Sequence, residues 1–223
     1  MVASRRDFLE AVGRGACALG AFGLGIAALA PESQGAAPVA LRPPGAREAG
    51  RFLAACARCG LCARACPYDT LRLARLADDA PAGTPIYVAR DVPCEMCPDI
   101  PCVVACPTGA LDKSLVDIAK ARMGTAVLTS PETCLNVRGL RCDVCYRVCP
   151  LIEKAITLEA QHNAGTGRHA RLVPVVHAEA CTGCGKCEKS CVLEEAAIKV
   201  LPVALAASRA GKHDVYGNRA RTS

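Results

Sequence analysis

The chain has 223 residues, which allows one or two domains. Seventeen are cysteine, whereas Phe, Trp and Tyr together make up 3% of the chain, so aromatic side chains cannot supply most of a core. The charged fraction of 22% contains no long block of one sign, which excludes wholesale disorder, and no apolar run reaches about eighteen residues, which excludes a polytopic membrane protein. The formal net charge of +6 counts every cysteine as neutral.

The amino-terminal residues are expected to be a targeting segment. Arg5 and Arg6 precede Phe8, and a Gly- and Ala-rich apolar stretch follows over residues 16–30. The stretch is too short to span a bilayer but suits the apolar region of a signal peptide, and the paired arginines resemble the twin-arginine signal, which exports folded proteins. We therefore predict a twin-arginine signal peptide at 1–30, cleaved or retained as an anchor. Cys17 belongs to this segment, and the Pro-, Gly- and Ala-rich residues 31–50 are expected to be a linker.

The other cysteines fall into four groups of four. Groups one and four have the spacing C-x2-C-x2-C-x3-C, group two widens the middle gap to four residues, and group three widens the first gap to seven. A proline follows the last cysteine of groups one, two and three. In chain order the groups are Cys56, Cys59, Cys62 and Cys66; Cys94, Cys97, Cys102 and Cys106; Cys134, Cys142, Cys145 and Cys149; and Cys181, Cys184, Cys187 and Cys191.

This spacing is typical of [4Fe-4S] clusters, which bind four thiolates at the corners of a tetrahedron. Three closely spaced cysteines can wrap one face of a cluster, and the fourth cysteine ligates the other cluster of a two-cluster ferredoxin. We expect the fourth cysteine and its proline to begin a short helix. Disulfides suit an even cysteine count in an exported chain, and zinc suits C-x2-C pairs, but neither requires a three-plus-one pattern four times over. The prediction is four [4Fe-4S] clusters held by all sixteen cysteines.

Between the groups the sequence predicts short elements. Strands are expected at 86–89 and 125–128, a hairpin from 156–159 and 172–176, and a helix from a capping box at Ser114 to about Arg122. The fold class is α+β: two pseudo-symmetric ferredoxin-like modules with two [4Fe-4S] clusters each, short strands and helices, and long loops. The cluster-binding region covers 51–202, and 203–223 is expected to be a flexible basic tail.

The residues alone leave open which groups share a module. Sequential pairing joins one with two and three with four, whereas nested pairing joins one with four and two with three. The two regular groups are the outer ones, and this symmetry, with a resemblance to the four-cluster subunits of molybdoenzymes, favours nesting: an outer module at 51–80 plus 165–202 and an inner module at 85–162. The expected ligand sets are then Cys56, Cys59, Cys62 with Cys191; Cys181, Cys184, Cys187 with Cys66; Cys94, Cys97, Cys102 with Cys149; and Cys134, Cys142, Cys145 with Cys106.

Segments 56–71, 89–97, 139–147 and 182–189, with the lead-in 41–46, resemble the MauM/NapG ferredoxin-type family, most of all its nitrate-reductase branch. The resemblance implies a periplasmic iron–sulfur subunit, peripheral to the inner membrane, that carries electrons from a membrane-integral quinol dehydrogenase subunit of the NapH type. The acceptor would be a periplasmic cytochrome c or nitrate reductase. The alternatives are an equivalent relay or maturation protein for methylamine dehydrogenase, and an assembly or docking factor.

Nothing in the sequence favours an enzyme with its own substrate site. It contains no Gly-rich nucleotide loop, and its four histidines show no metal-ligand spacing. Arg58, Arg141, Arg147 and Lys186 lie inside the cysteine groups, where they either tune the clusters, contact a redox partner or are ordinary solvated charges. Because each oxidised cluster with its thiolates is negatively charged, the basic side chains serve as countercharge, and no nucleic-acid partner is expected.

Overall fold

A computed structural model describes residues 40–163, 167 and 169–210 of the chain. The chain divides into two units, Met1–Ala36 and Ala37–Ser223, and all described residues belong to the second. The expected twin-arginine segment lies outside the described residues, as does 211–223. None of the described helices has the length and apolar character needed to cross a membrane.

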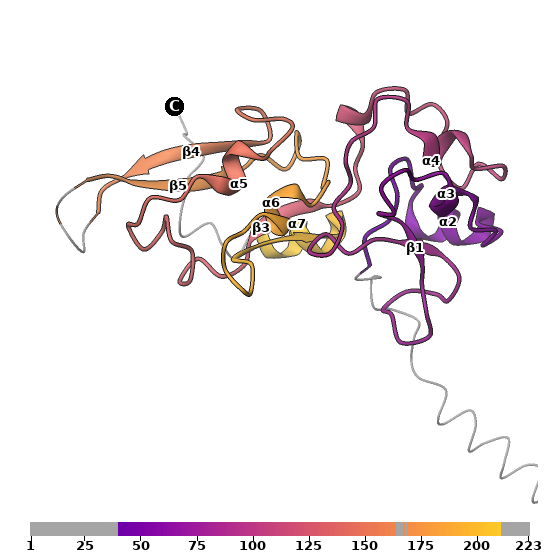
Figure 1. Ribbon diagram of the computed structural model, residues 1–223, viewed down its shortest axis with the longest axis horizontal. Coiled ribbons are helices and arrows are strands. Elements are labelled where there is room, and N and C mark those ends of the chain that lie inside the picture. The colour runs from indigo at the N-terminus through magenta and orange to yellow at the C-terminus, as the bar shows by residue number, and fades with distance from the viewer. Residues whose placement is uncertain (1–39, 164–166, 168, 211–223) are drawn as a thin grey trace, which may run out of the picture. The chain divides into compact units, whose positions relative to one another are not determined.

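Short elements joined by long loops make up the described chain (Figure 1). This small mixed chain of helices and strands agrees with the predicted α+β class. The helices are α2 (Ala49–Ala55), α3 (Leu61–Arg64), α4 (Pro101–Val104), α5 (Val144–Arg147), α6 (Lys186–Lys189), α7 (Val203–Ala210) and the 3-10 helix η1 (Ile118–Lys120). The strands are β1 (Arg72–Leu73), β2 (Pro85–Ile86), β3 (Thr125–Leu128), β4 (Ile156–Gln161), β5 (Arg171–Val176) and β6 (Ile198–Leu201).

The named strands form three antiparallel pairs, β1–β2, β3–β6 and β4–β5. The β4–β5 pair is the predicted hairpin, with Ile156 opposite Val176, and β3 lies where a strand was predicted. Its partner β6 comes from the far end of the chain, a long-range pairing that local patterns do not reveal. The strand predicted at 86–89 is shorter than expected, because β2 ends at Ile86 and Tyr87 adds a single bridge to Leu41.

The helix predicted from Ser114 to Arg122 is wrong in extent, since only Ile118–Lys120 is helical. Its cap is Asp117, whose carboxylate accepts from the backbone N–H of Ala119 at 3.0 Å. The Ser114 N–H instead donates to the Asp112 carboxylate at 3.0 Å. The Asp side chains therefore organise turns here, and Ser114 does not begin a capping box.

The linker predicted at 31–50 is also wrong for its described part. Leu41 is 6% exposed and Pro43 is among the most buried side chains of the described chain. The Arg42 guanidinium lies 5.0 Å from the centre of the Phe52 ring and donates to Thr84 Oγ1 at 2.6 Å. A segment rich in Pro and Gly thus packs as part of the core, because its side chains find tertiary partners that composition does not show.

The expected flexible tail is partly helical. Residues 203–210 form α7, and Ala206 within it is 3% exposed. The helix contacts β3, so the first part of this segment packs on the folded chain. The rest of it lies outside the described residues.

Small side chains and cysteines dominate the core. Phe52 and Tyr87 are the aromatic residues in the cluster of buried apolar side chains, beside Cys62, Cys102, Cys106, Cys181 and Cys184. Helices α3, α4, α5 and α6 have four residues each, and helices shorter than about twelve residues are marginal on their own. The fold therefore needs the cysteine groups to be tied together by what they bind.

We predict that removing iron from the purified protein unfolds it. Chelation under oxidising conditions is expected to abolish the cooperative thermal transition followed by far-ultraviolet circular dichroism, because ligation free energy is folding free energy in such chains. A chelated protein, verified as iron-free, that keeps both its spectrum and its transition would contradict the prediction.

Candidate iron–sulfur centres

Four cavities, named A to D, are lined by the sixteen cysteines of the four groups. Each cavity is lined by the first three cysteines of one group and the fourth cysteine of another, and Cys145 of cavity D also borders cavity C. The sets are Cys56, Cys59, Cys62 and Cys106 in A; Cys94, Cys97, Cys102 and Cys66 in B; Cys181, Cys184, Cys187 and Cys149 in C; and Cys134, Cys142, Cys145 and Cys191 in D.

The cavities correct the nested pairing. Groups one and two exchange their fourth cysteines, Cys66 and Cys106, and groups three and four exchange Cys149 and Cys191. The pairing is therefore sequential, and modules at 51–80 plus 165–202 and at 85–162 do not exist as such. Helix α3 packs on α4 and α5 on α6, so each module forms from neighbouring groups.

The insertions that favoured nesting have only local consequences. In group two the wider gap holds Ile100, a left-handed residue at φ 43° that precedes α4. In group three the wider gap forms a loop in which Asn136 Oδ1 accepts from the Cys142 N–H at 2.8 Å. Each insertion is absorbed in its own loop and carries no information about the partner group.

Each four-residue helix carries the third cysteine of its group at its second position: Cys62 in α3, Cys102 in α4, Cys145 in α5 and Cys187 in α6. The helix ends before the fourth cysteine, so the prediction that this cysteine begins a helix is wrong. A residue that precedes proline is steered away from the helical region, which stops α3 ahead of Cys66. The fourth cysteine thus leaves the helix and reaches the neighbouring cavity.

Cys145 lines both cavity C and cavity D. Burial raises the pKa of this thiol to about 12, and the nearby thiols that raise it further are Cys134, Cys142 and Cys191 in that order. All three belong to cavity D. The Cys145 thiol is therefore assigned to D, which completes a set of four there.

Burial decides the protonation of most shifted thiols. It raises the pKa of Cys62 to about 11, with Cys56, Cys106 and Cys59 of the same cavity adding to the effect. It raises the pKa of Cys102 to about 12, with Cys94 and Cys66 as the neighbouring thiols. Four thiolates in one apolar cavity are thus unfavourable alone, and they require a cationic group between them, as iron provides.

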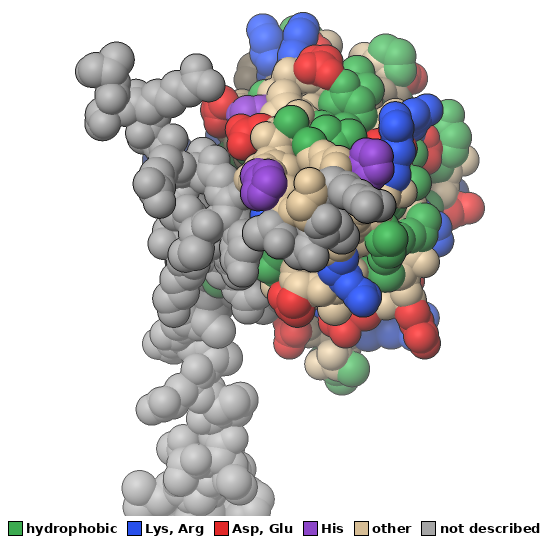
Figure 2. Space-filling model, turned by 90° about the vertical axis from the view of Figure 1, so that its left-hand side faces the viewer, with side chains coloured by type: hydrophobic (Ala, Val, Ile, Leu, Met, Phe, Trp, Pro, Cys, Tyr) green, Lys and Arg blue, Asp and Glu red, His purple; other side chains and the backbone are tan. Residues whose placement is uncertain are grey.

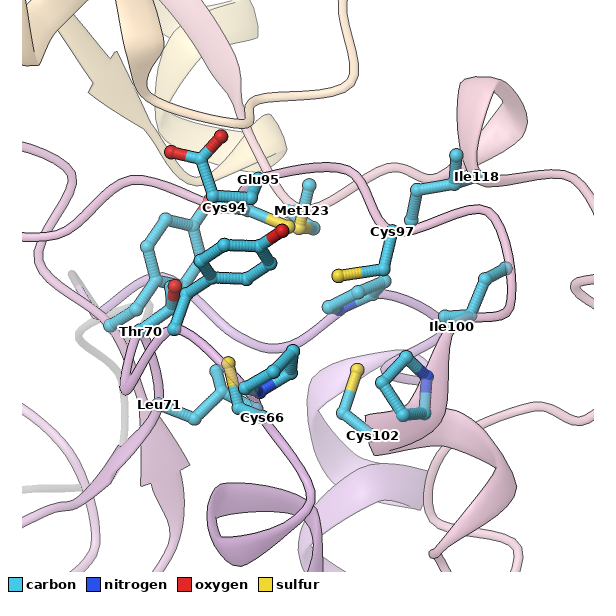
Figure 3. A pocket seen from close by; sticks show the side chains of 15 residues that line it. Cys66, Thr70, Leu71, Cys94, Glu95, Cys97, Ile100, Cys102, Ile118 and Met123 are labelled. Atoms are coloured by element: carbon cyan, nitrogen blue, oxygen red, sulfur yellow. The ribbon is translucent and has the colours of Figure 1, made fainter.

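The view into cavity B shows how the side chains converge (Figure 3). The sulfur atoms of Cys66, Cys97 and Cys102 face a common space, beside Met123 and Ile100. Tyr68 also lines this cavity. Tyr146, which lies beside Cys145, is not among the residues that line cavity D, and its hydroxyl donates to the Glu153 carboxylate.

The donor set fits an iron–sulfur cluster. All sixteen described cysteines are free thiols. Within the described residues, no three Cys, His, Asp or Glu side chains are placed to hold a single metal ion. The thiols converge on four common sites, and four cysteine thiolates are the usual ligands of a [4Fe-4S] cluster.

Of the four charged residues inside the groups, two are paired. The Arg147 guanidinium lies 2.7 Å from the Asp143 carboxylate, and Lys186 forms an ion pair with Glu95. Arg58 lines cavity A, and its side chain packs over Gly83. Sequence reasoning missed Arg90, which binds five backbone carbonyls, because a single arginine between motifs carries no local signal.

Known proteins match the chain over nearly its whole length. The 4Fe-4S dicluster domain family matches residues 55–110 and 140–194, so each match covers two consecutive cysteine groups in whole or in large part. The ferredoxin-type protein NapG of Escherichia coli is 58% identical over 96% of this chain and 92% of its own. The chain belongs to the NapG/MauM ferredoxin-type family. Two further relatives are NapG of Haemophilus influenzae, 58% identical over 94% of this chain and 75% of its own, and the methylamine utilization ferredoxin-type protein MauM of Methylorubrum extorquens, 51% identical over 94% of each.

Membership of the NapG/MauM family supports an iron–sulfur electron-transfer role for the chain and the character of an electron carrier rather than an enzyme. No solved structure matches the chain. Within this family the two dicluster matches agree with the sequential grouping of cavities A with B and C with D.

The four sets of cysteines predict which serine variants lose the same iron–sulfur signal. Cys66→Ser and Cys97→Ser are expected to lose the same component of the low-temperature electron paramagnetic resonance (EPR) spectrum, because both cysteines line cavity B. Cys62→Ser is the matched control from the same group as Cys66, and it should lose the component of cavity A. If Cys66→Ser instead reproduces the spectrum of Cys184→Ser, the nested pairing is restored and the cavity assignment fails.

Proposed function

We propose that the chain is an electron-transfer subunit with four [4Fe-4S] clusters that carries electrons from a membrane quinol dehydrogenase of the NapH type toward periplasmic nitrate reductase. When bound, the clusters supply one-electron redox chemistry. The observation that carries the proposal is the presence of four cavities with four cysteines each in a chain 58% identical to NapG. The chain is not itself an enzyme in this proposal.

The residues around the cavities hold the clusters and adjust their electrostatic surroundings. The backbone N–H of Ala126 lies 3.4 Å from the Cys181 sulfur and donates to it. Desolvation of Cys106 is outweighed by hydrogen bonds from the backbone of Leu111 and from Thr108, and the pKa of this thiol falls below its usual value. Hydrogen bonds to sulfur and burial are the terms by which a protein sets cluster potentials, so different cavities are expected to differ in potential.

Charges of both signs lie on one face of the described chain. On the face that carries the β4–β5 hairpin, acidic and basic side chains of the described residues are interspersed (Figure 2). Proteins that bind nucleic acids usually concentrate Lys and Arg on one stripe or patch. This face has no such one-signed patch among the described residues in view.

A second candidate follows from the MauM relatives, which are 51% identical over 94% of this chain. In that case the chain would be an equivalent relay or a maturation protein for methylamine dehydrogenase. The two candidates share the cavities and differ in the external acceptor. Measuring electron transfer from the purified, reduced protein to each acceptor decides between them. A docking factor would transfer electrons to neither acceptor.

We predict that Cys94→Ser blocks quinol-dependent nitrate reduction in cells that depend on this chain. Cys94 lines cavity B, and losing one of its four thiols interrupts the relay. The matched control is Cys17→Ser, because Cys17 stands outside the four groups and in the expected signal segment. Immunoblots must show that both variants are made and exported.

A docking role predicts a different result from the same cells. If Cys94→Ser supports nitrate reduction at the rate of the unaltered chain while its iron content falls below about sixteen atoms per chain, the relay is refuted. The chain would then act by assembly alone.

We also propose that the chain is periplasmic, peripheral to the inner membrane, and exported folded by the twin-arginine route. Replacing Arg5 and Arg6 with lysine keeps the charge but removes the arginine pair, and is expected to leave the iron-loaded protein in the cytoplasm. Fractionation of cells checks this. Arg47→Lys and Arg51→Lys together are the control for a double change beyond the signal, because both side chains are exposed. Periplasmic recovery of the Arg5/Arg6 variant would contradict the route.

A further inference from the structure

The two modules touch through residues that line their inner cavities. The amino-terminal module contains cavities A and B, and the carboxyl-terminal module contains C and D. The backbone N–H of Cys94 donates to the carbonyl oxygen of Cys184 at 2.8 Å. Cys94 lines cavity B and Cys184 lines cavity C, so one hydrogen bond joins a cysteine of each module.

Two more hydrogen bonds join the walls of B and C. Tyr87 lines cavity B, is 2% exposed, and donates its hydroxyl to the carbonyl of Gly183, which lines cavity C. Met123 lines cavity B, and its backbone N–H donates at 2.9 Å to the carbonyl of Thr182, which lines cavity C. Three residues that line cavity B are therefore hydrogen-bonded directly to three that line cavity C. We call these six residues the junction: Tyr87, Cys94, Met123, Thr182, Gly183 and Cys184.

The junction requires close backbone approach. Gly185 has φ 91°, and a Cβ there would lie 2.6 Å from the Cβ of Ala89. Gly183 has φ 76°, and a Cβ there would overlap the backbone of Gly124. A side chain at either position would push the surfaces apart, because real Cβ atoms do not approach that closely. Glycine thus sets the separation of B from C.

Charged side chains also bind across the contact between the two modules. Arg90 donates to the carbonyl oxygens of Glu188, Lys189, Cys191, Leu193 and Glu194, at distances from 2.5 to 3.2 Å. Lys186 pairs with Glu95 across the same contact. An arginine with its donors on so many carbonyls is locked in place, so the two modules meet in one defined arrangement.

We propose that the junction is the place where the two modules exchange electrons, and that the four cavities act in the order A, B, C, D. This inference rests on the proposed function. A and B are adjacent because groups one and two exchange cysteines, and C and D are adjacent for the same reason. With iron–sulfur groups bound in B and C, the junction residues would hold the two groups at the separation over which one electron passes. One group would be oxidised as the other is reduced, with no bond made or broken and no proton moved.

This order differs from the order of the groups along the chain. Group four, the last in sequence, lies at the centre of the relay, and group three lies at one end. The external partners accordingly meet the protein at cavities A and D. At cavity A the Cys59 side chain is exposed, whereas Cys62 and Cys106 are buried.

The test uses the intact, iron-loaded protein without quinol or nitrate. After partial reduction by a photoreductant, freeze-quench EPR follows redistribution of electrons between modules, and the fully reduced protein reports magnetic interaction between B and C. Gly185→Ala is expected to lose this interaction and to slow redistribution, with iron content unchanged. Gly109→Ala is the matched control, since Gly109 also has positive φ, at 70°, but has nothing within 4 Å of an added Cβ.

Tyr87→Phe is the second variant, because it keeps the ring in cavity B and removes only the hydroxyl that reaches Gly183. It too is expected to slow redistribution. The proposal is overturned if both variants keep their iron and both redistribute electrons like the unaltered protein.

If the variants lose iron, serine variants of the cysteines decide the order. Cys97→Ser, which disables B, should abolish magnetic interaction between the modules, whereas Cys59→Ser, which disables A, should preserve it. The opposite result overturns the order. If the variants behave as expected but the protein does not accept electrons from quinol, only the proposed function is refuted. If B or C holds no iron–sulfur group, both the proposed function and the junction proposal are refuted.

Discussion

The exchange of a fourth cysteine between neighbouring groups is the constraint on which the rest of the structure depends. Cys66 and Cys106 cross between cavities A and B, and Cys149 and Cys191 cross between C and D. Each crossing brings two one-turn helices together, α3 with α4 and α5 with α6, although none of these helices is long enough to be stable alone. Strands of two to six residues and loops then wrap these paired centres, and a chain with almost no aromatic residues acquires a core.

The cysteine groups and the hairpin could be predicted from local sequence patterns. The wrong predictions about pairing and packing concerned contacts between residues far apart in the sequence. The cysteine spacing indicated the groups, and alternation with a turn indicated the β4–β5 hairpin. The pairing of groups failed because symmetry between spacings says nothing about the path of the chain between them. The β3–β6 pairing and the burial of Leu41 and Pro43 depend on residues far away in sequence, which composition and periodicity do not report.

The basic side chains find their partners inside the molecule. Arg42 binds Thr84 and the Phe52 ring, Arg90 binds carbonyl oxygens, and Arg122 donates to the carbonyl of Cys181. Guanidinium groups are well suited to this task, because their donors are arranged in a rigid fork. These three arginines therefore order loops around the cysteine-lined cavities.

The crossed cysteines also have a consequence for biosynthesis. When a ribosome has released group one, cavity A still lacks Cys106, and it can be completed only once group two has emerged. The same holds for cavity D, which lacks Cys191 until nearly the whole chain is made. No cavity of a module has its four cysteines until the second group of that module is being made. Cluster insertion therefore has to wait for the second group, and the two cavities of a module become complete within a few residues of each other.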